Sequence, residues 1–204
     1  MYSFLGTFLI LLMIGLDDFM RGLILAFFFI MPAYFANGSA PIFGKSGHPI
    51  DGGRKFKNGF RVLGDGKTWE GSLGGLIVGI ITGYLLYLLR YDIHGLLVKC
   101  SLEASSEVLY LLDRMFPSLS ITLSFGAIFG DIIGAFFKRR LGLPRGAPLL
   151  FLDQLDFLIF AILMSTPCYS LRLEVIMILL VLTPGIHLIS NMGGYLLKLK
   201  KEPW

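Results

Sequence analysis

Charged residues are scarce in this chain. Lys, Arg, Asp and Glu make up only 16% of its 204 residues, whereas hydrophobic residues make up 55%, and the mean hydropathy is +0.74. A water-soluble domain of this length carries more charge and fewer apolar residues. The composition therefore excludes a soluble protein and indicates an integral membrane protein.

Cysteine and a strong excess of one charge are also lacking. The two cysteines, Cys100 and Cys168, lie far apart, which excludes a disulfide framework and a cysteine metal knuckle. Lys and Arg number 18 against 14 Asp and Glu, a net charge of +4. This excess is normal for a membrane chain with basic loops and too small to indicate nucleic-acid binding. We therefore expect no nucleic-acid partner.

Five apolar runs are long enough to cross a bilayer, because a hydrocarbon core of about 30 Å needs roughly 20 helical residues. Backbone polar groups must be paired in lipid, so these runs are predicted to be helices and the fold to be all-α. No internal repeat is visible, and residues 1–204 are predicted to form a single membrane domain. The predicted spans are residues 19–36, 72–89, 119–137, 149–167 and 174–197.

A further apolar stretch, residues 3–16, precedes the first span and ends at Asp17 and Asp18. It lacks the basic start and the cleavage site of a signal peptide. We expect an uncleaved interfacial segment or an extension of the first helix. Two adjacent carboxylates are costly at the centre of a bilayer, so Asp17 and Asp18 are expected at the outer boundary of that helix.

Most basic residues gather in residues 37–71, in a short turn at residues 138–148 and in the C-terminal tail, whereas residues 90–118 balance their charges. The positive-inside rule then places residues 37–71 and 138–148 in the cytoplasm and residues 90–118 outside. It predicts a multi-pass protein of the cell membrane with an external N-terminus, a cytoplasmic C-terminus and a structured cytoplasmic loop after the first helix.

The predicted loop 37–71 is rich in glycine and in both charges. Glycine lets the backbone approach an anion closely, and Lys67 and Thr68 directly precede a predicted helix whose N-terminal amides attract phosphate. The loop is therefore a candidate phosphate-binding site. The alternative is a basic loop attracted to anionic lipid headgroups.

Three aspartates lie in or at the start of apolar runs, where ionisable residues are costly and usually functional. Asp153 and Asp156 are three residues apart and share one helix face, and the turn at 138–148 brings that face toward the helix of Asp131. Three converging carboxylates would repel one another, so a divalent cation, magnesium by ligand type, is expected among them. The alternative is structural pairing with neighbouring basic residues.

Lys138, Arg139 and Arg140 stand beside these acids, and their side chains suit phosphate oxygens. Carboxylates for a metal and bases for phosphates at one membrane face predict phosphoryl or nucleotidyl transfer. A lipid or ion transporter is the alternative outside the enzymes, because intramembrane acids also mark conduction paths.

The motifs also follow one another in a characteristic order. They are Ala36-Asn37, Pro41, Pro49-Ile50-Asp51, Gly64-Asp65-Gly66-Lys67-Thr68-Trp69, Gly71, Gly130-Asp131, Lys138-Arg139-Arg140 with Gly142, and Asp153-Gln154-Leu155-Asp156-Phe157. Over about residues 30–200 this set resembles the archaeal CDP-archaeol synthases and, more distantly, the bacterial phosphatidate cytidylyltransferases. Two positions depart from the pattern: Ala135 stands where serine is expected and Asn58 where aspartate is expected.

The resemblance implies an enzyme that uses CTP and magnesium to activate a membrane lipid phosphate, 2,3-bis-O-geranylgeranyl-sn-glycerol 1-phosphate, with release of pyrophosphate. A diacyl phosphatidate is the alternative lipid, and the oligomeric state stays open, with a homodimer as one option. The residues expected in catalysis are Asp131, Asp153, Asp156 and Lys138, the three aspartates binding the metal. Those expected to bind nucleotide and phosphate are Asn37, Asp51, Gly64, Asp65, Lys67, Thr68, Arg139 and Arg140.

Overall fold

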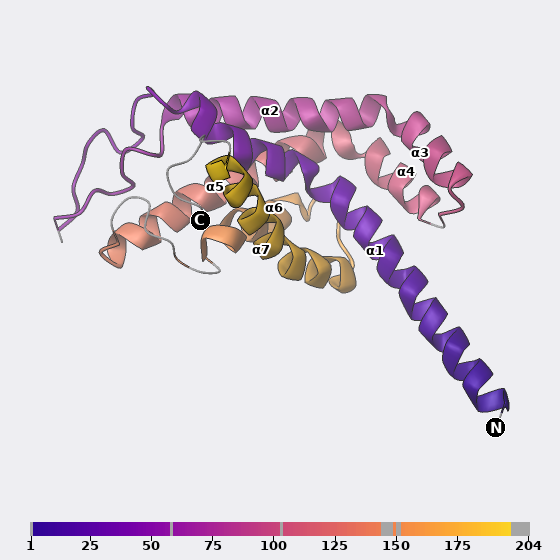
Figure 1. Cartoon of the computed structure of the whole chain (residues 1–204). Coiled ribbons are helices and arrows are strands. Elements are labelled where there is room, and N and C mark those ends of the chain that lie inside the picture. Colours follow the sequence, from indigo (N-terminus) through magenta and orange to yellow (C-terminus); the bar gives the residue numbers. More distant parts are fainter. Residues whose placement is uncertain (1, 58, 103, 144–148, 150–151, 197–204) are drawn as a thin grey trace.

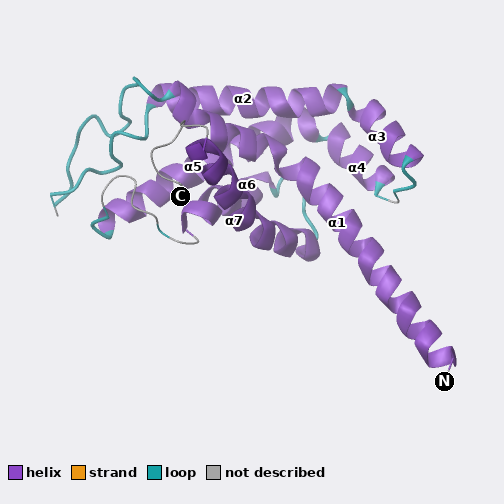
Figure 2. Ribbon diagram, in the orientation of Figure 1, coloured by secondary structure: helices purple, strands orange, loops and turns teal. Residues whose placement is uncertain are grey.

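The computed structural model describes residues 2–57, 59–102, 104–143, 149 and 152–196 (Figures 1 and 2). Over these residues the chain is helical and contains no strand, only two isolated bridges between α1 and α2. The prediction of an all-α fold is therefore confirmed. The helices are α1 (Tyr2–Phe43), α2 (Trp69–Leu88), α3 (Arg90–Lys99), α4 (Ser105–Asp113), a π-helical turn (Met115–Leu119), α5 (Ser120–Arg140), α6 (Leu152–Ser165) and α7 (Leu173–Leu196).

Three described helical segments are long and apolar enough to cross a membrane: Gly15–Phe43, Trp69–Leu88 and Met115–Arg140. They correspond to the first three predicted spans. The fourth predicted span is a helix of 14 residues, α6, about 21 Å long at 1.5 Å per residue. In the fifth, Leu173–Ile186 forms a shorter apolar helical segment within α7.

The first helix is longer at both ends than the predicted span 19–36, and residues 3–16 follow the alternative of a helix extension. α1 begins at Tyr2, so residues 3–16 continue the first helix, and its N-terminal part stands away from the other helices (Figure 1). The predicted helix boundary at Asp17 and Asp18 is wrong, because both lie inside α1. At its other end α1 continues to Phe43, so the connecting loop begins at Gly44 rather than at residue 37.

Two other predicted connections are also more helical than expected. Residues 90–118 contain α3, α4 and most of the π-helical turn, with Val108 and Leu111 completely buried. Three of the basic residues assigned to the turn at 138–148, Lys138, Arg139 and Arg140, lie in the last turn of α5. Residues 144–148 lie outside the described part of the chain.

Rows of glycine let α2 pack closely on its neighbours. A β-carbon at Gly75 would lie 2.6 Å from the Ala36 carbonyl oxygen, and one at Gly79 would lie 2.7 Å from the Pro32 carbonyl oxygen, both on α1. Such contacts between small residues and backbone are typical of membrane helices, where close van der Waals packing drives association. The close packing holds the ends of α1 and α2, and thus the loop between them, beside α5.

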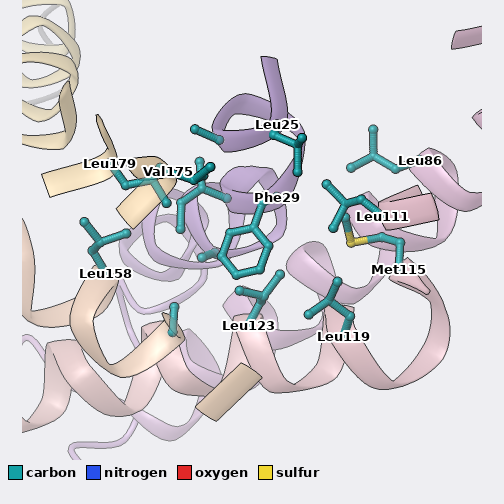
Figure 3. Close-up of a cluster of buried hydrophobic side chains, with 14 of the residues drawn as sticks. Leu25, Phe29, Leu86, Leu111, Met115, Leu119, Leu123, Leu158, Val175 and Leu179 are labelled. Atoms are coloured by element: carbon teal, nitrogen blue, oxygen red, sulfur yellow. The ribbon is translucent and has the colours of Figure 1, made fainter. Parts of the chain in front are cut away.

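The apolar core lies in the middle of this helix assembly (Figure 3). Phe29 of α1 is completely buried there, and the side chains around it come from α4, the π-helical turn, α5, α6 and α7. Labelled members of the core are Leu111, Met115, Leu119, Leu123, Leu158, Val175 and Leu179. The C-terminal end of α5 lies toward the α1–α2 loop (Figure 1).

Candidate active site

The candidate site is formed by the loop between α1 and α2, the C-terminal end of α5 and the N-terminal end of α6. Glycines on α5 allow α6 to approach its backbone: a β-carbon at Gly126 would lie 2.5 Å from the Phe160 carbonyl oxygen. Two turns further along α5, Gly134 faces Asp156, and a β-carbon there would lie 2.8 Å from Asp156 Cγ. The close contact between α5 and α6 therefore continues up to the carboxylates.

Two lysines are paired with two of the predicted catalytic aspartates. Lys67 Nζ from the loop lies 2.5 Å from Asp131 Oδ2 on α5, and Lys138 Nζ on α5 lies 2.8 Å from Asp153 Oδ2 on α6. The Leu149 amide also donates to Asp153 Oδ2, at 3.1 Å. Each aspartate side chain is about a quarter exposed, at 27%, so both pairs can be reached by a solute.

Asp156 is the most buried of the three aspartates, with 8% of the residue exposed. Its Oδ1 accepts a hydrogen bond of 2.6 Å from the Phe157 amide. Asp131, Asp153 and Lys67 all interact electrostatically with this carboxylate. The structure thus brings the three aspartates and Lys67 to the same end of the α5–α6 pair.

The carboxylate oxygens of the three aspartates are ligands of the type that a hard cation prefers. Asp131 and Asp153 each use Oδ2 for a lysine, and Asp156 uses Oδ1 for an amide. One carboxylate oxygen of each remains for a ligand, and magnesium prefers such oxygens. Among the described residues, however, no three acidic, histidine or cysteine side chains are grouped as a metal site. Lys67 and Lys138 supply positive charge to Asp131 and Asp153, and the Lys138–Asp153 pair is of the kind expected as the structural alternative to a cation.

Asp51 lies inside the loop, with its side chain 1% exposed. It accepts hydrogen bonds from Arg61 Nη2 at 2.5 Å and from the amides of Leu63 and Gly64 at 3.0 Å each. The hydrogen bonds from Arg61 are the main reason that the pKa of the Asp51 carboxyl lies well below its usual range, and the amides lower this pKa further. Asp65, another predicted phosphate-binding residue, accepts from Arg61 Nη1 at 2.6 Å. Both carboxylates therefore bind the loop itself.

Thr68 is the N-cap of α2 and is 2% exposed. Its hydroxyl accepts from the Gly71 amide at 3.1 Å, and the Trp69 amide donates to the His48 carbonyl oxygen at 3.0 Å. These N-terminal amides of α2, expected to attract phosphate, are thus bonded within the protein. The prediction that Asn37 lies in the loop is wrong, because Asn37 is half-buried in α1.

The two predicted phosphate-binding arginines at the end of α5 also contact protein. Arg139 is buried and donates to the Leu143 carbonyl oxygen. Arg140 donates from Nη2 to the Arg61 carbonyl oxygen at 2.9 Å, and its guanidinium carbon lies 4.0 Å from the centre of the Phe56 ring. The sequence does not indicate the roles of Arg61 and Phe56, because no spacing pattern marks a residue whose contacts lie within a loop.

The two departures from the expected motif have different positions. Ala135 lies on α5 next to Gly134 and is buried, with 8% exposed, so an apolar side chain suits its surroundings. Asn58 lies outside the described residues.

Residues 19–204 match the family of CarS-like CDP-archaeol synthases. The CDP-archaeol synthase of Thermococcus onnurineus is 44% identical over 185 residues, which cover 91% of this chain and 99% of the relative. The enzyme of Pyrococcus horikoshii shows the same identity and coverage. A solved structure described as "an intramembrane enzyme for archaeal membrane lipids biosynthesis" superposes with a TM-score of 0.64 at 33% identity, covering 82% of this chain and 92% of the other. This chain therefore belongs to the CDP-archaeol synthase family.

Proposed function

We propose that this protein transfers a cytidylyl group from CTP to 2,3-bis-O-geranylgeranyl-sn-glycerol 1-phosphate, giving the CDP-activated lipid and pyrophosphate. The observation that carries the proposal is the presence of two Lys–Asp pairs, Lys67–Asp131 and Lys138–Asp153, whose aspartates both interact with Asp156, in a chain of this family. A reaction between two anionic substrates requires cationic side chains that bind the phosphates and carboxylates that bind a metal.

The lipid phosphate is itself the nucleophile. A phosphomonoester has a second pKa near 6, so it is largely a dianion near pH 7 and needs no general base. One of its oxygens attacks the α-phosphorus of CTP, the new P–O bond forms, and the bond from the α-phosphorus to the bridging oxygen breaks. The electron pair leaves with pyrophosphate, so charge accumulates on the leaving group.

The paired lysines can respond to these charges. We infer that Lys67 and Lys138 turn from their aspartates toward substrate phosphates, since both pairs are partly exposed. This movement frees the Oδ2 atoms of Asp131 and Asp153 for a cation. Magnesium held by these two residues and Asp156 would offset charge on the triphosphate and on pyrophosphate.

The proposed location follows from the two substrates. CTP is soluble, whereas the lipid phosphate lies at the depth of the headgroups, so a site at the helix ends reaches both. The loop between α1 and α2 carries a clear excess of basic residues, which supports a cytoplasmic position for this end of the helices by the positive-inside rule. We therefore propose an enzyme of the cell membrane with its site facing the cytoplasm.

The proposal is tested with purified protein in detergent micelles, CTP and magnesium. Isoprenoid ether phosphate and diacyl phosphatidate are compared as acceptors, and ATP and UTP replace CTP in parallel reactions. We expect CDP-lipid and pyrophosphate in equal amounts from CTP and the ether lipid. Asp156→Asn should abolish turnover while the protein stays folded, as judged by its circular dichroism. Pyrophosphate release without CDP-lipid would contradict the proposal.

A further inference from the structure

The loop between α1 and α2 is organised around Arg61. Its guanidinium donates to Asp51 from Nη2 at 2.5 Å and from Nε at 3.2 Å, and to Asp65 from Nη1 at 2.6 Å. The Asp51 carboxylate in turn binds the amides of Leu63 and Gly64. One arginine thus joins the first part of the loop to the part that leads into α2.

The backbone of Arg61 ties the same loop to α5. Its carbonyl oxygen accepts a hydrogen bond of 2.9 Å from Arg140 Nη2. The Arg140 guanidinium carbon lies 4.0 Å from the ring centre of Phe56 in the loop and 5.0 Å from that of Phe136 on α5. Arg140 is therefore held between loop and helix, and Arg61 is its polar partner on the loop.

Lys67 is joined to this part of the loop by backbone hydrogen bonds. Its carbonyl oxygen accepts from the Ile50 amide at 2.9 Å, next to Asp51, and its amide lies 3.4 Å from the Gly64 carbonyl oxygen. Its Nζ reaches Asp131 across 64 positions of sequence. Removal of the Arg61 guanidinium would leave the buried Asp51 carboxylate without its cation, which is strongly destabilising locally. The disturbed amides of Leu63 and Gly64 lie only a few residues before Lys67.

We propose that Arg61 is a positioning residue for cytidylyl transfer: it holds the loop so that Lys67 lies at Asp131, from where it turns toward the substrate phosphates. The inference rests on the proposed function of the site. Positive charge alone does not account for the proposed role of Arg61. Arg54 in the same loop carries the same charge, but it is exposed and forms no ion pair with the described residues. Arg61 differs from it by its fork-like contact with one carboxylate and its second contact with another.

The first experiment compares kcat and KM of Arg61→Gln, Arg61→Lys and the control Arg54→Gln. We expect kcat/KM to fall roughly 10- to 100-fold in Arg61→Gln, because small displacements of a substrate-binding group have effects of this size. Arg61→Lys keeps the charge but not the planar fork, so it should recover only part of the loss. Arg54→Gln should match the unsubstituted protein. Equal rates for Arg61→Gln and Arg54→Gln would overturn the inference.

A double-mutant cycle separates positioning from general damage. If Arg61 acts through Lys67, adding Arg61→Gln to Lys67→Met should change the rate by less than about twofold, since the two losses share one cause. The same additional loss as in the unsubstituted background would overturn the inference. Chymotrypsin cleavage after Phe56 and Phe60 gives a readout that needs no activity: Arg61→Gln should be cleaved faster than Arg54→Gln. Equal cleavage would also overturn it.

These outcomes remain distinct from a failure of the proposed function. If the unsubstituted protein forms no CDP-lipid, the function is wrong, while faster cleavage of Arg61→Gln would still show that Arg61 holds the loop. If the unsubstituted protein and Arg54→Gln are both active and Arg61→Gln equals them, only the positioning role is wrong.

Discussion

Gly134 of α5 lies directly against the carboxylate of Asp156 on α6, so that a β-carbon at position 134 would lie 2.8 Å from Asp156 Cγ. The glycine is what allows the buried acid to sit between the two helices. Since the contact involves the carboxylate itself, a methyl group at this position must move the acid or separate the helices.

Gly134→Ala should therefore lower kcat/KM by at least about tenfold, although alanine favours a helix over glycine by about 1 kcal/mol. The matched control is Gly185→Ala on α7, where a β-carbon would meet nothing within 4 Å. We expect this control to keep full activity. Activity of Gly134→Ala equal to that of the control would show that the position of Asp156 is not critical.

Removal of divalent cations should abolish turnover, because the proposed reaction joins two anionic substrates and a cation held by Asp131, Asp153 and Asp156 would offset their charge. EDTA should stop product formation, and magnesium should restore it. Asp131→Asn should raise the magnesium concentration needed for half-maximal rate. Asp113→Asn alters an aspartate at the end of α4 that is paired with Arg90 at the start of α3, and it should leave this concentration unchanged. Full activity in EDTA would contradict a metal role for the aspartates.

The loop should resist mild acid. The Arg61 guanidinium lowers the pKa of Asp51 below the usual value of about 4, so its contribution to loop stability is complete above about pH 4. The contribution disappears only as the pH falls through the lowered pKa. Hydrogen-exchange protection factors of the Leu63 and Gly64 amides should therefore stay constant from pH 7 to about pH 5.

The Asp51→Asn variant provides the control for this pH dependence. It should show lower protection of the same amides at every pH, with no acid transition of its own, because the titrating carboxyl is gone. Loss of protection in the unsubstituted protein already between pH 6 and pH 5 would show that Asp51 does not hold the loop.

The sequence predicted the helical fold, because apolar runs and helical spacing are local properties. The metal site predicted at Asp131, Asp153 and Asp156 stays a prediction. The sequence did not predict that α1 continues through Asn37 and Pro41, since Asn-Gly-Ser-Ala-Pro is typical of loops. In the structure Ser39 Oγ donates to the Phe35 carbonyl oxygen at 2.7 Å within the helix. Packing against the glycine row of α2 overrides the local preference.

Local sequence patterns could not predict which partners the charged residues would contact. The pairing of Lys67 with Asp131 depends on how the loop folds over α5. Asp51 has the residue type of a ligand for metal or phosphate coordination, yet its oxygens are occupied by Arg61 and by loop amides. Residue type and spacing cannot separate these two uses of a carboxylate, because only the tertiary structure shows which donors surround it.

The central claim is that the α-phosphorus of CTP is transferred to a lipid phosphate. The most direct test incubates the purified protein with the isoprenoid ether phosphate and CTP that carries a radioactive label on either the α- or the γ-phosphorus. We predict that the α-label enters the organic lipid phase, whereas the γ-label stays in water as pyrophosphate. Transfer of the γ-label to lipid, or no labelled lipid at all, would contradict the account.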